Sequence, residues 1–185
     1  MITPDGWYEH AVRIISPNVD GRPAEEVVSV LVIHNISLPP GEFGGGHIQD
    51  FFTNSLKVAE HSYFATIADT RVSAHLLIDR SGVITQFASF HQRAWHAGIS
   101  SFAGRDKCND FSIGIELEGT DIDPYTDIQY QRLTEVTGAL MSYYPAISLE
   151  RIVGHCDIAP QRKTDPGTSF DWHHYFSALT HKSGV

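Results

Sequence analysis

The chain has 185 residues, of which 42% are hydrophobic and 11% are aromatic, and its formal net charge is -9. These values are typical of a folded globular protein and exclude a long disordered chain, so we expect a single domain over residues 1–185. The acidic balance disfavours nucleic acid, anionic membranes and anionic wall polymers as partners. No apolar run reaches the roughly 20 residues that a membrane-spanning helix needs, and no protein partner is indicated.

The N-terminus and the cysteines bear on the cellular compartment. Residues 1–7 have neither the basic flank nor the apolar core of a secretory signal. Cys108 and Cys156 are the only cysteines, too few for a disulfide framework. We therefore expect a cytoplasmic protein with reduced thiols.

The first elements expected along the chain lead to a central strand. Residues 1–26 contain prolines and are expected to be irregular. Residues 27–34 are apolar on both faces, which is typical of a strand inside a sheet. Alternation along this strand places Val30, Val32 and His34 on one face. The imidazole should therefore emerge near the carboxyl end of the strand.

A loop of prolines and glycines at 37–46 separates this strand from two short helices, expected at 47–56 and 59–68. Residues 72–78 and 83–87 flank a Gly-containing turn and predict a β-hairpin. The first hairpin strand carries His75. We interpret this residue as a hydrogen-bonded sheet histidine rather than a metal ligand, because a packed histidine is the commoner case.

The second half of the chain is expected to alternate strands and helices. The predicted elements are a strand at 113–118, a helix at 127–144, a short strand at 151–153 and a closing helix at 170–179. Thr126 and Gln129 form a capping box at the start of the long helix, and Pro145 ends it. Strands interspersed with covering helices predict an α/β or α+β fold.

The run from Gly154 to Gly167 is the richest in chemical groups. Its two prolines argue against a regular helix or central strand across it, so we expect an irregular loop. His155 and Asp165 are suitable zinc ligands, and His34 is the favoured third ligand. Three protein ligands leave a fourth position for water, as in catalytic zinc sites. Cys156 remains an alternative ligand because zinc also binds sulfur.

Four motifs occur in order: VIHNIS at 32–37, RAWHAG at 93–98, IGIELEGT at 113–120 and GHCDIAP at 154–160. With them the chain resembles the N-acetylmuramoyl-L-alanine amidases, which are related to phage amidases and peptidoglycan recognition proteins. Within that family it is similar to the cytoplasmic zinc amidases specific for 1,6-anhydro-N-acetylmuramyl peptides. The similarity runs from about residue 7 to residue 172.

The resemblance implies a mostly antiparallel or mixed central sheet flanked by helices. It also implies one zinc ion per chain, held by His34, His155 and Asp165. Glu116 and Lys163 match the catalytic pair of the family: the first would carry the proton between water and the leaving amine, and the second would stabilise the oxyanion. Glu118, on the same face of the predicted strand as Glu116, is a rival for the base.

The substrate implied by the resemblance is an anhydro-muropeptide, cut between the lactyl group and L-alanine. Asn35, Trp95, Arg71 and Lys107 are candidate binding residues, two for the body of the ligand and two cations for stem-peptide carboxylates. Trp95 is equally well explained as a buried anchor. For Arg71 the alternative, a solvated charge at a strand edge, is the less favoured one. The family usually carries Arg where this chain has Lys107, and Lys lacks the bidentate fork of Arg.

The functional hypothesis is therefore a hydrolase of peptidoglycan recycling. The resemblance further implies that its loss raises the muropeptide signals that induce β-lactamase. The alternatives are a recognition module that binds peptidoglycan fragments without cutting them, a structural zinc domain, and an amidase that acts on intact wall. The complete ligand set disfavours the module, and the lack of a closed four-ligand set disfavours the structural domain.

Overall fold

A six-stranded sheet forms the centre of the structure, a computed structural model that describes residues 1–182. The strands lie in the order β1 (Val12–Arg13), β5 (Ile84–Gln86), β4 (Leu76–Ile78), β9 (Ser112–Glu118), β3 (Val30–Ile36) and β10 (Ile152–Gly154). Only the β4–β5 hairpin is antiparallel; the other four pairs are parallel. The expectation of a mixed sheet is confirmed, and the expectation of a mostly antiparallel one is wrong.

The long connections between strands make the parallel pairing possible. Parallel neighbours need crossovers, and the predicted helices supply them. Between β3 and β4 the chain forms α1 (His47–Phe52), the 3-10 helix η1 (Val58–Glu60) and α2 (Phe64–Ile67). Between β9 and β10 it forms α3 (Asp127–Tyr143) and η3 (Leu149–Arg151). The carboxyl ends of β3, β9 and β10 consequently meet at one edge of the sheet.

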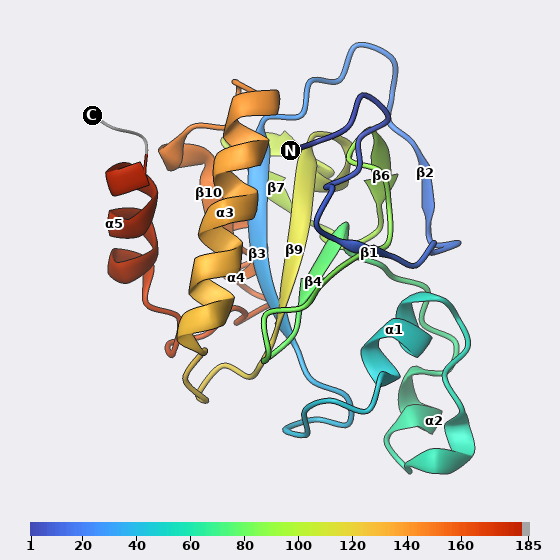
Figure 1. Cartoon of the computed structure of the whole chain (residues 1–185). Helices are drawn as coiled ribbons and strands as arrows, with labels where there is room; N and C mark the ends of the chain where they lie inside the picture. The colour runs from blue at the N-terminus through green and yellow to red at the C-terminus, as the bar shows by residue number, and fades with distance from the viewer. Residues whose placement is uncertain (183–185) are drawn as a thin grey trace.

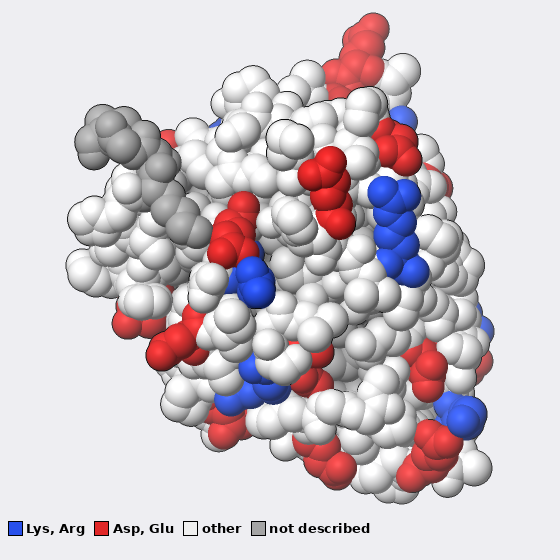
Figure 2. Space-filling view, viewed as in Figure 1, with Lys and Arg blue, Asp and Glu red and all other residues white. Residues whose placement is uncertain are grey.

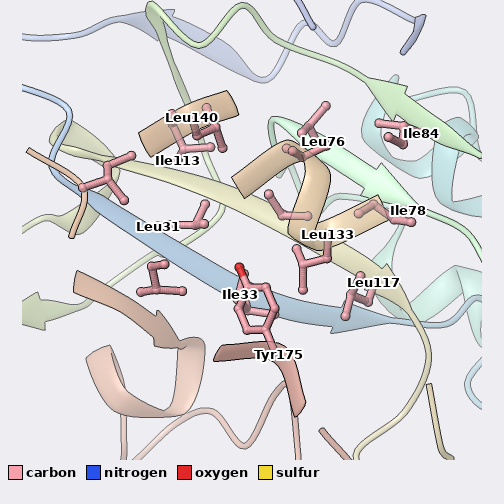
Figure 3. Packing of buried hydrophobic residues seen from close by; sticks show 14 of the residues in the cluster. Leu31, Ile33, Leu76, Ile78, Ile84, Ile113, Leu117, Leu133, Leu140 and Tyr175 are labelled. Carbon is pink, nitrogen blue, oxygen red and sulfur yellow. The ribbon is translucent and has the colours of Figure 1, made fainter. Parts of the chain in front are cut away.

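One face of the sheet packs against α3 and the last helix, α5 (Trp172–Lys182), as Figure 1 shows. This main core contains Leu31 and Ile33 from β3, whereas Leu133 and Leu140 come from α3. Figure 3 shows these side chains interleaved between the strands and the two helices, with Tyr175 of α5 beside them. The apolar stripe of the long predicted helix is therefore core, as its spacing indicated.

The other face of the sheet is covered by two smaller clusters. Val30 and Val32 pack there with the segment that contains η2 (Cys108–Asp110) and with α4 (His155–Ile158). Beside them, α1 and α2 pack on Leu77 and lie away from α3 and α5 in Figure 1. The same face of the sheet carries His34 of β3 and its register partner Glu116 of β9, and most of the predicted site residues gather around these two.

Most long predicted elements are confirmed, with shifted ends. α3 begins at the expected capping box, in which Thr126 accepts the Gln129 N–H and the Gln129 side chain accepts the Thr126 N–H. The helix expected at 47–56 ends early, at Phe52, and the one expected at 59–68 splits into η1 and α2. One helical turn, α4, stands at the start of a run that was expected to be irregular.

Several short strands were not predicted, because they lie in segments that show no apolar periodicity. β2 (Val19–Gly21) pairs with β6 (Gln92–Ala94), and β7 (Ser101–Phe102) pairs with β8 (Arg105–Asp106). No helix within residues 1–182 has the length and apolarity to cross a bilayer. On the face drawn in Figure 2, acidic and basic side chains are interspersed and no basic patch gathers, as the net charge of -9 suggests.

Candidate metal centre and its pocket

Two neighbouring parallel strands bring the two predicted histidine ligands to one place. His34 lies near the end of β3, and Gly154 of β10 is in register with Ile33. His155 therefore follows at the level of His34, as the first residue of α4. The chain then turns back after Pro160, and the Asp165 carbonyl accepts the Cys156 N–H at 2.9 Å. This bond returns the Asp165 side chain to the histidines.

The three ligand atoms form a small triangle. His34 Nδ1 lies 2.9 Å from His155 Nδ1 and 3.1 Å from Asp165 Oδ2, and His155 Nδ1 lies 3.0 Å from Asp165 Oδ2. Tetrahedral ligands at zinc distances of about 2.0–2.1 Å stand roughly 3.3 Å apart, close to these separations. The three residues are 1%, 3% and 8% exposed, so the group is sheltered from water. The donor set fits a divalent cation.

The protonation states also suit a cation. Burial, followed by the nearby His155 and Lys163, lowers the pKa of His34 to about 4 against the opposing effect of Asp165. A neutral imidazole and an ionised carboxylate are the forms that bind metal.

Glu116 stands next to this triangle, in register with His34 across the β3–β9 pair. It is 9% exposed, and its Oε2 atom is buried with no hydrogen-bond partner in the described residues. Burial, reinforced by the charge of Asp165 and partly offset by Lys163, raises the pKa of Glu116 well above its ordinary value. A buried carboxyl group whose pKa is raised in this way is suited to take and return a proton.

Glu118, the rival base, is engaged elsewhere. Its two carboxylate oxygens accept the Gly44 N–H at 2.6 Å and the Arg80 N–H at 3.1 Å. Glu118 thereby ties the loop at 37–46 to the end of the hairpin, and it does not line the pocket described next. The geometry favours Glu116 as the base.

The metal group opens into a pocket of about 380 Å³. One wall is polar and contains the three ligand residues, Glu116 and the half-buried Lys163. The facing wall is largely apolar and is formed by the loop at 37–46 together with α1 and α2. That wall contains Leu38, Pro40, Phe51, Phe52, Tyr63 and Ile67. A larger hollow of about 640 Å³, between the N-terminal segment and α3, shares no residue with this site.

Two of the four predicted binding residues lie in the pocket. Trp95 is half-buried in its wall. Asn35 lines it as well, although its amide nitrogen already donates to Asp121 Oδ1 at 2.8 Å and to the Pro166 carbonyl at 3.1 Å. Asn35 therefore has less freedom to bind a ligand than its sequence position indicated.

The other two predicted binding residues lie outside the lining. Arg71 is exposed, and its guanidinium donates to the carbonyls of Ala68 and Thr70 at 2.8 and 3.2 Å. Lys107 is exposed in the left-handed conformation, with φ of 61°, at the start of η2. Neither cation is brought to the metal group.

The neighbouring candidates take structural positions. His75 is a hydrogen-bonded sheet histidine, as interpreted from the sequence: its Nδ1 accepts the Gly114 N–H at 3.0 Å, and its Nε2 donates to the Gln92 carbonyl at 3.1 Å. Cys156 lies outside the ligand triangle, and burial raises the pKa of its thiol.

His96 is the residue that the sequence analysis did not single out. It is 9% exposed, and its Nδ1 lies 2.9 Å from Nε2 of His34. The only available signal was its place in the motif at 93–98, which gives no hint of contact with a residue 62 positions away.

Comparison with known proteins points to one family. A family model described as N-acetylmuramoyl-L-alanine amidase matches residues 24–168. The chain is 57% identical to the 1,6-anhydro-N-acetylmuramyl-L-alanine amidase AmpD of Citrobacter freundii, over 99% of this chain and 97% of that protein. A crystal structure of a selenomethionine derivative of AmpD matches with a TM-score of 0.93 and 57% identity, over 97% of this chain and 99% of that one.

A further solved structure holds a ligand. The complex of the E. coli amidase AmiD with anhydro-N-acetylmuramic acid-L-Ala-D-γ-Glu-L-Lys is 31% identical, with a TM-score of 0.61. The match covers 87% of this chain and 65% of that one.

Proposed function

The chain belongs to the N-acetylmuramoyl-L-alanine amidase family, and from this premise we propose that it is a single zinc amidase domain over residues 1–185. Its reaction is hydrolysis of the amide between the lactyl group of 1,6-anhydro-N-acetylmuramic acid and L-alanine of the stem peptide. One observation carries this proposal: a triangle of His34, His155 and Asp165 opens into a pocket beside a buried carboxyl group, Glu116.

One zinc ion per chain would be held by His34 Nδ1, His155 Nδ1 and Asp165 Oδ2. A bound zinc ion supplies a Lewis acid for the carbonyl and lowers the pKa of water to about 7. Glu116 takes the proton of the attacking water as oxygen adds to the carbonyl carbon, and returns it to nitrogen as the C–N bond breaks. The Lys163 ammonium faces the negative charge that develops on the carbonyl oxygen.

Two observations support the substrate. The AmiD complex contains an anhydro-muramyl peptide, and the AmpD relatives are named for the same anhydro sugar. The pocket has a polar wall for the reacting amide and an apolar wall for the sugar or peptide body. We propose that Asn35 and Trp95, which line the pocket, contact the ligand there. We assign Arg71 and Lys107, which lie outside the pocket, to the carboxylates of a stem peptide that extends beyond it.

We place this reaction in peptidoglycan recycling in the cytoplasm, where the products of wall turnover are small muropeptides. Loss of the enzyme would then raise the muropeptide signal for β-lactamase induction. An acidic chain of net charge -9 is poorly suited to the anionic polymers of intact wall.

The test is hydrolysis of anhydro-muramyl-tripeptide by purified protein, with a chelator, with zinc restored, and with Glu116→Ala. We expect free tripeptide that disappears on chelation, returns with zinc and nearly vanishes in the variant. Intact sacculi assayed in parallel should release little. Bound zinc and ligand binding without tripeptide release would refute the enzyme and support a recognition module; preferential cleavage of sacculi would indicate a wall amidase.

A further inference from the structure

We infer that His96 is a positioning residue: with Ser112 it sets which ring nitrogen of His34 carries the proton, so that Nδ1 faces the metal position as a bare electron pair. This inference rests on the proposed function, because it concerns the proposed zinc site. It is carried by the direction of a chain of hydrogen bonds rather than by any single contact.

The chain starts at a backbone carbonyl. Ser112 Oγ lies 2.6 Å from the Cys108 carbonyl oxygen, which can only accept, so the hydroxyl hydrogen is spent there. Ser112 Oγ must then accept at its 3.1 Å contact with Nε2 of His96, which therefore carries the ring hydrogen. A neutral imidazole has one N–H, so Nδ1 of His96 is an acceptor. It accepts Nε2–H of His34 at 2.9 Å, which leaves His34 Nδ1 unprotonated.

Ala97, the residue after His96, sets the position of the proton on the second histidine ligand, His155. Nε2 of His155 lies 3.2 Å from the carbonyl oxygen of Ala97 and must donate to it. Because a neutral imidazole has one N–H, His155 Nδ1 is then unprotonated as well. Three electron-rich atoms, the two Nδ1 atoms and Asp165 Oδ2, thus meet about 3 Å apart with no hydrogen left to link them. Such an arrangement favours a cation at its centre.

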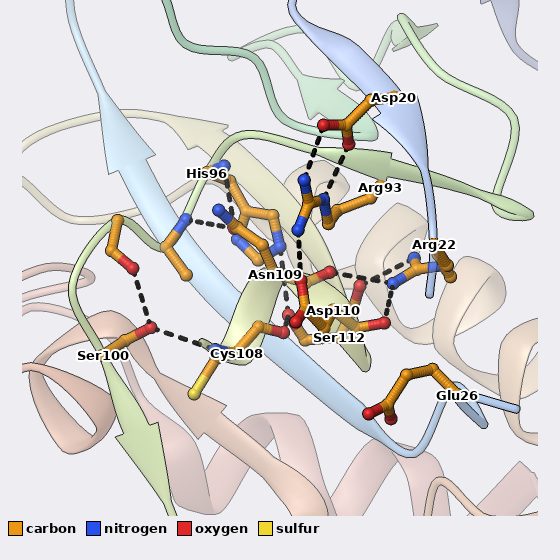
Figure 4. Close-up of polar contacts among 12 residues, drawn as sticks. Asp20, Arg22, Glu26, Arg93, His96, Ser100, Cys108, Asn109, Asp110 and Ser112 are labelled. Carbon is orange, nitrogen blue, oxygen red and sulfur yellow. Dashed lines mark hydrogen bonds and ion pairs between the residues drawn. The ribbon is translucent and has the colours of Figure 1, made fainter. Parts of the chain in front are cut away.

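His96 and Ala97, which contact the two histidine ligands, are themselves held in place by hydrogen bonds. Asn109 Oδ1 accepts the backbone N–H groups of His96 at 3.1 Å and Ala97 at 2.8 Å, as Figure 4 shows for the polar network around η2. Arg22 donates to the carbonyls of Asn109 and Asp110 at 2.9 and 3.0 Å, and Arg93 binds Asp110. These bonds hold η2, whose Cys108 carbonyl begins the chain.

The sheet also leaves room for this ring. Gly114 of β9 lies beneath His96, and a Cβ at that position would stand 2.5 Å from Cγ of the imidazole. The ring could not rest there over any other residue without moving. Glycine at position 114 therefore permits the 2.9 Å contact of His96 with His34.

Ser112→Ala tests the chain at its far end, on a residue that does not touch the metal position. Without the hydroxyl, His96 can carry its hydrogen on Nδ1 and donate to His34, which then places its own hydrogen on Nδ1, against the cation. We expect the zinc dissociation constant, measured by chelator competition, to rise by about 10- to 100-fold, the usual effect of losing a partner of a metal ligand.

Ser16→Ala is the matched control. Ser16 is 1% exposed and Ser112 is fully buried, and each hydroxyl donates to a backbone carbonyl at 2.6 Å. Ser16 lies outside the pocket lining and donates to Phe52. We expect Ser16→Ala to lose thermal stability to a similar degree while its zinc affinity stays within about twofold of wild type.

A second measurement reads the proton directly. In zinc-free protein labelled with 15N-histidine at pH 8, the His34 signal, assigned with His34→Gln, should show Nδ1 unprotonated in wild type and protonated in Ser112→Ala. A protonated Nδ1 in wild type would overturn the inference even if neither serine variant folds. Equal zinc affinities of the two serine variants would overturn it too. Failure of wild type to bind zinc would instead refute the proposed function, and the 15N measurement would still judge His96.

Discussion

Replacing Glu116 by Gln tests the chemistry most directly, because it changes one atom in the pocket. Glutamine keeps the size of the side chain but cannot take a proton. General acid–base groups contribute about 10²–10⁴-fold to rate, which is roughly 3–5.5 kcal/mol of activation free energy at 1.36 kcal/mol per tenfold. Glu116 is outside the ligand triangle, and its Oε2 has no partner in the described chain. We therefore expect kcat to fall by that factor while zinc is retained.

The assay is release of tripeptide from anhydro-muramyl-tripeptide at saturating substrate, with the zinc content of each sample measured. Glu118→Gln is the comparison, since Glu118 lies two residues further along the same strand and binds the N–H groups of Gly44 and Arg80. That variant should be less stable than wild type, and its kcat should fall by less than about tenfold. The reasoning fails if Glu116→Gln keeps more than a tenth of the activity, if its zinc is lost in parallel, or if Glu118→Gln is the weaker enzyme.

Three further outcomes are expected. Lys163→Met should lower kcat by about 10²–10³-fold with little change in zinc content; an unchanged kcat would remove Lys163 from the oxyanion role. In zinc-free protein, the raised pKa of Glu116 adds stability at low pH that is lost as pH rises from 4.5 through the folded-state pKa. Melting temperatures should therefore fall less between pH 4.5 and 8 in Glu116→Gln than in wild type, and parallel curves would contradict this. Thr126→Ala should cost about 1 kcal/mol of unfolding free energy through the lost cap of α3, as urea titration would show, and should leave zinc affinity unchanged.

Sequence periodicity predicted the parts of the fold that are long enough to show it. The apolar run ending at His34 became β3, and the capped stripe after Thr126 became α3. Parallel pairing was missed, because strand direction depends on which strands become neighbours and not on the residues within one strand. β3 lies between β9 and β10, which come from far along the chain.

The candidate site was likewise predicted only in part. Residue chemistry and the family resemblance were sufficient to select the ligand triangle, Glu116 and Lys163, and the structure brings all of them to one pocket. Contacts beyond it depend on side-chain direction, which a sequence does not record. Arg71 turns back to the carbonyls of Ala68 and Thr70, and His96 reaches His34 across 62 positions.

The same triangle has a consequence for how the protein persists in a cell. His34 and His155 are separated by 121 positions, so of the triangle only His155 and Asp165, ten positions apart, lie near each other in the unfolded chain. The complete triangle forms only after β3 and β10 have paired, so a metal at the proposed site would bind after this part of the fold is in place. Ligand that binds the native state alone stabilises it by about 2.7 kcal/mol at a hundred times its dissociation constant. Zinc at the proposed site would therefore stabilise the protein only after folding, and metal starvation should shorten the lifetime of the protein against proteases as well as stop the proposed reaction.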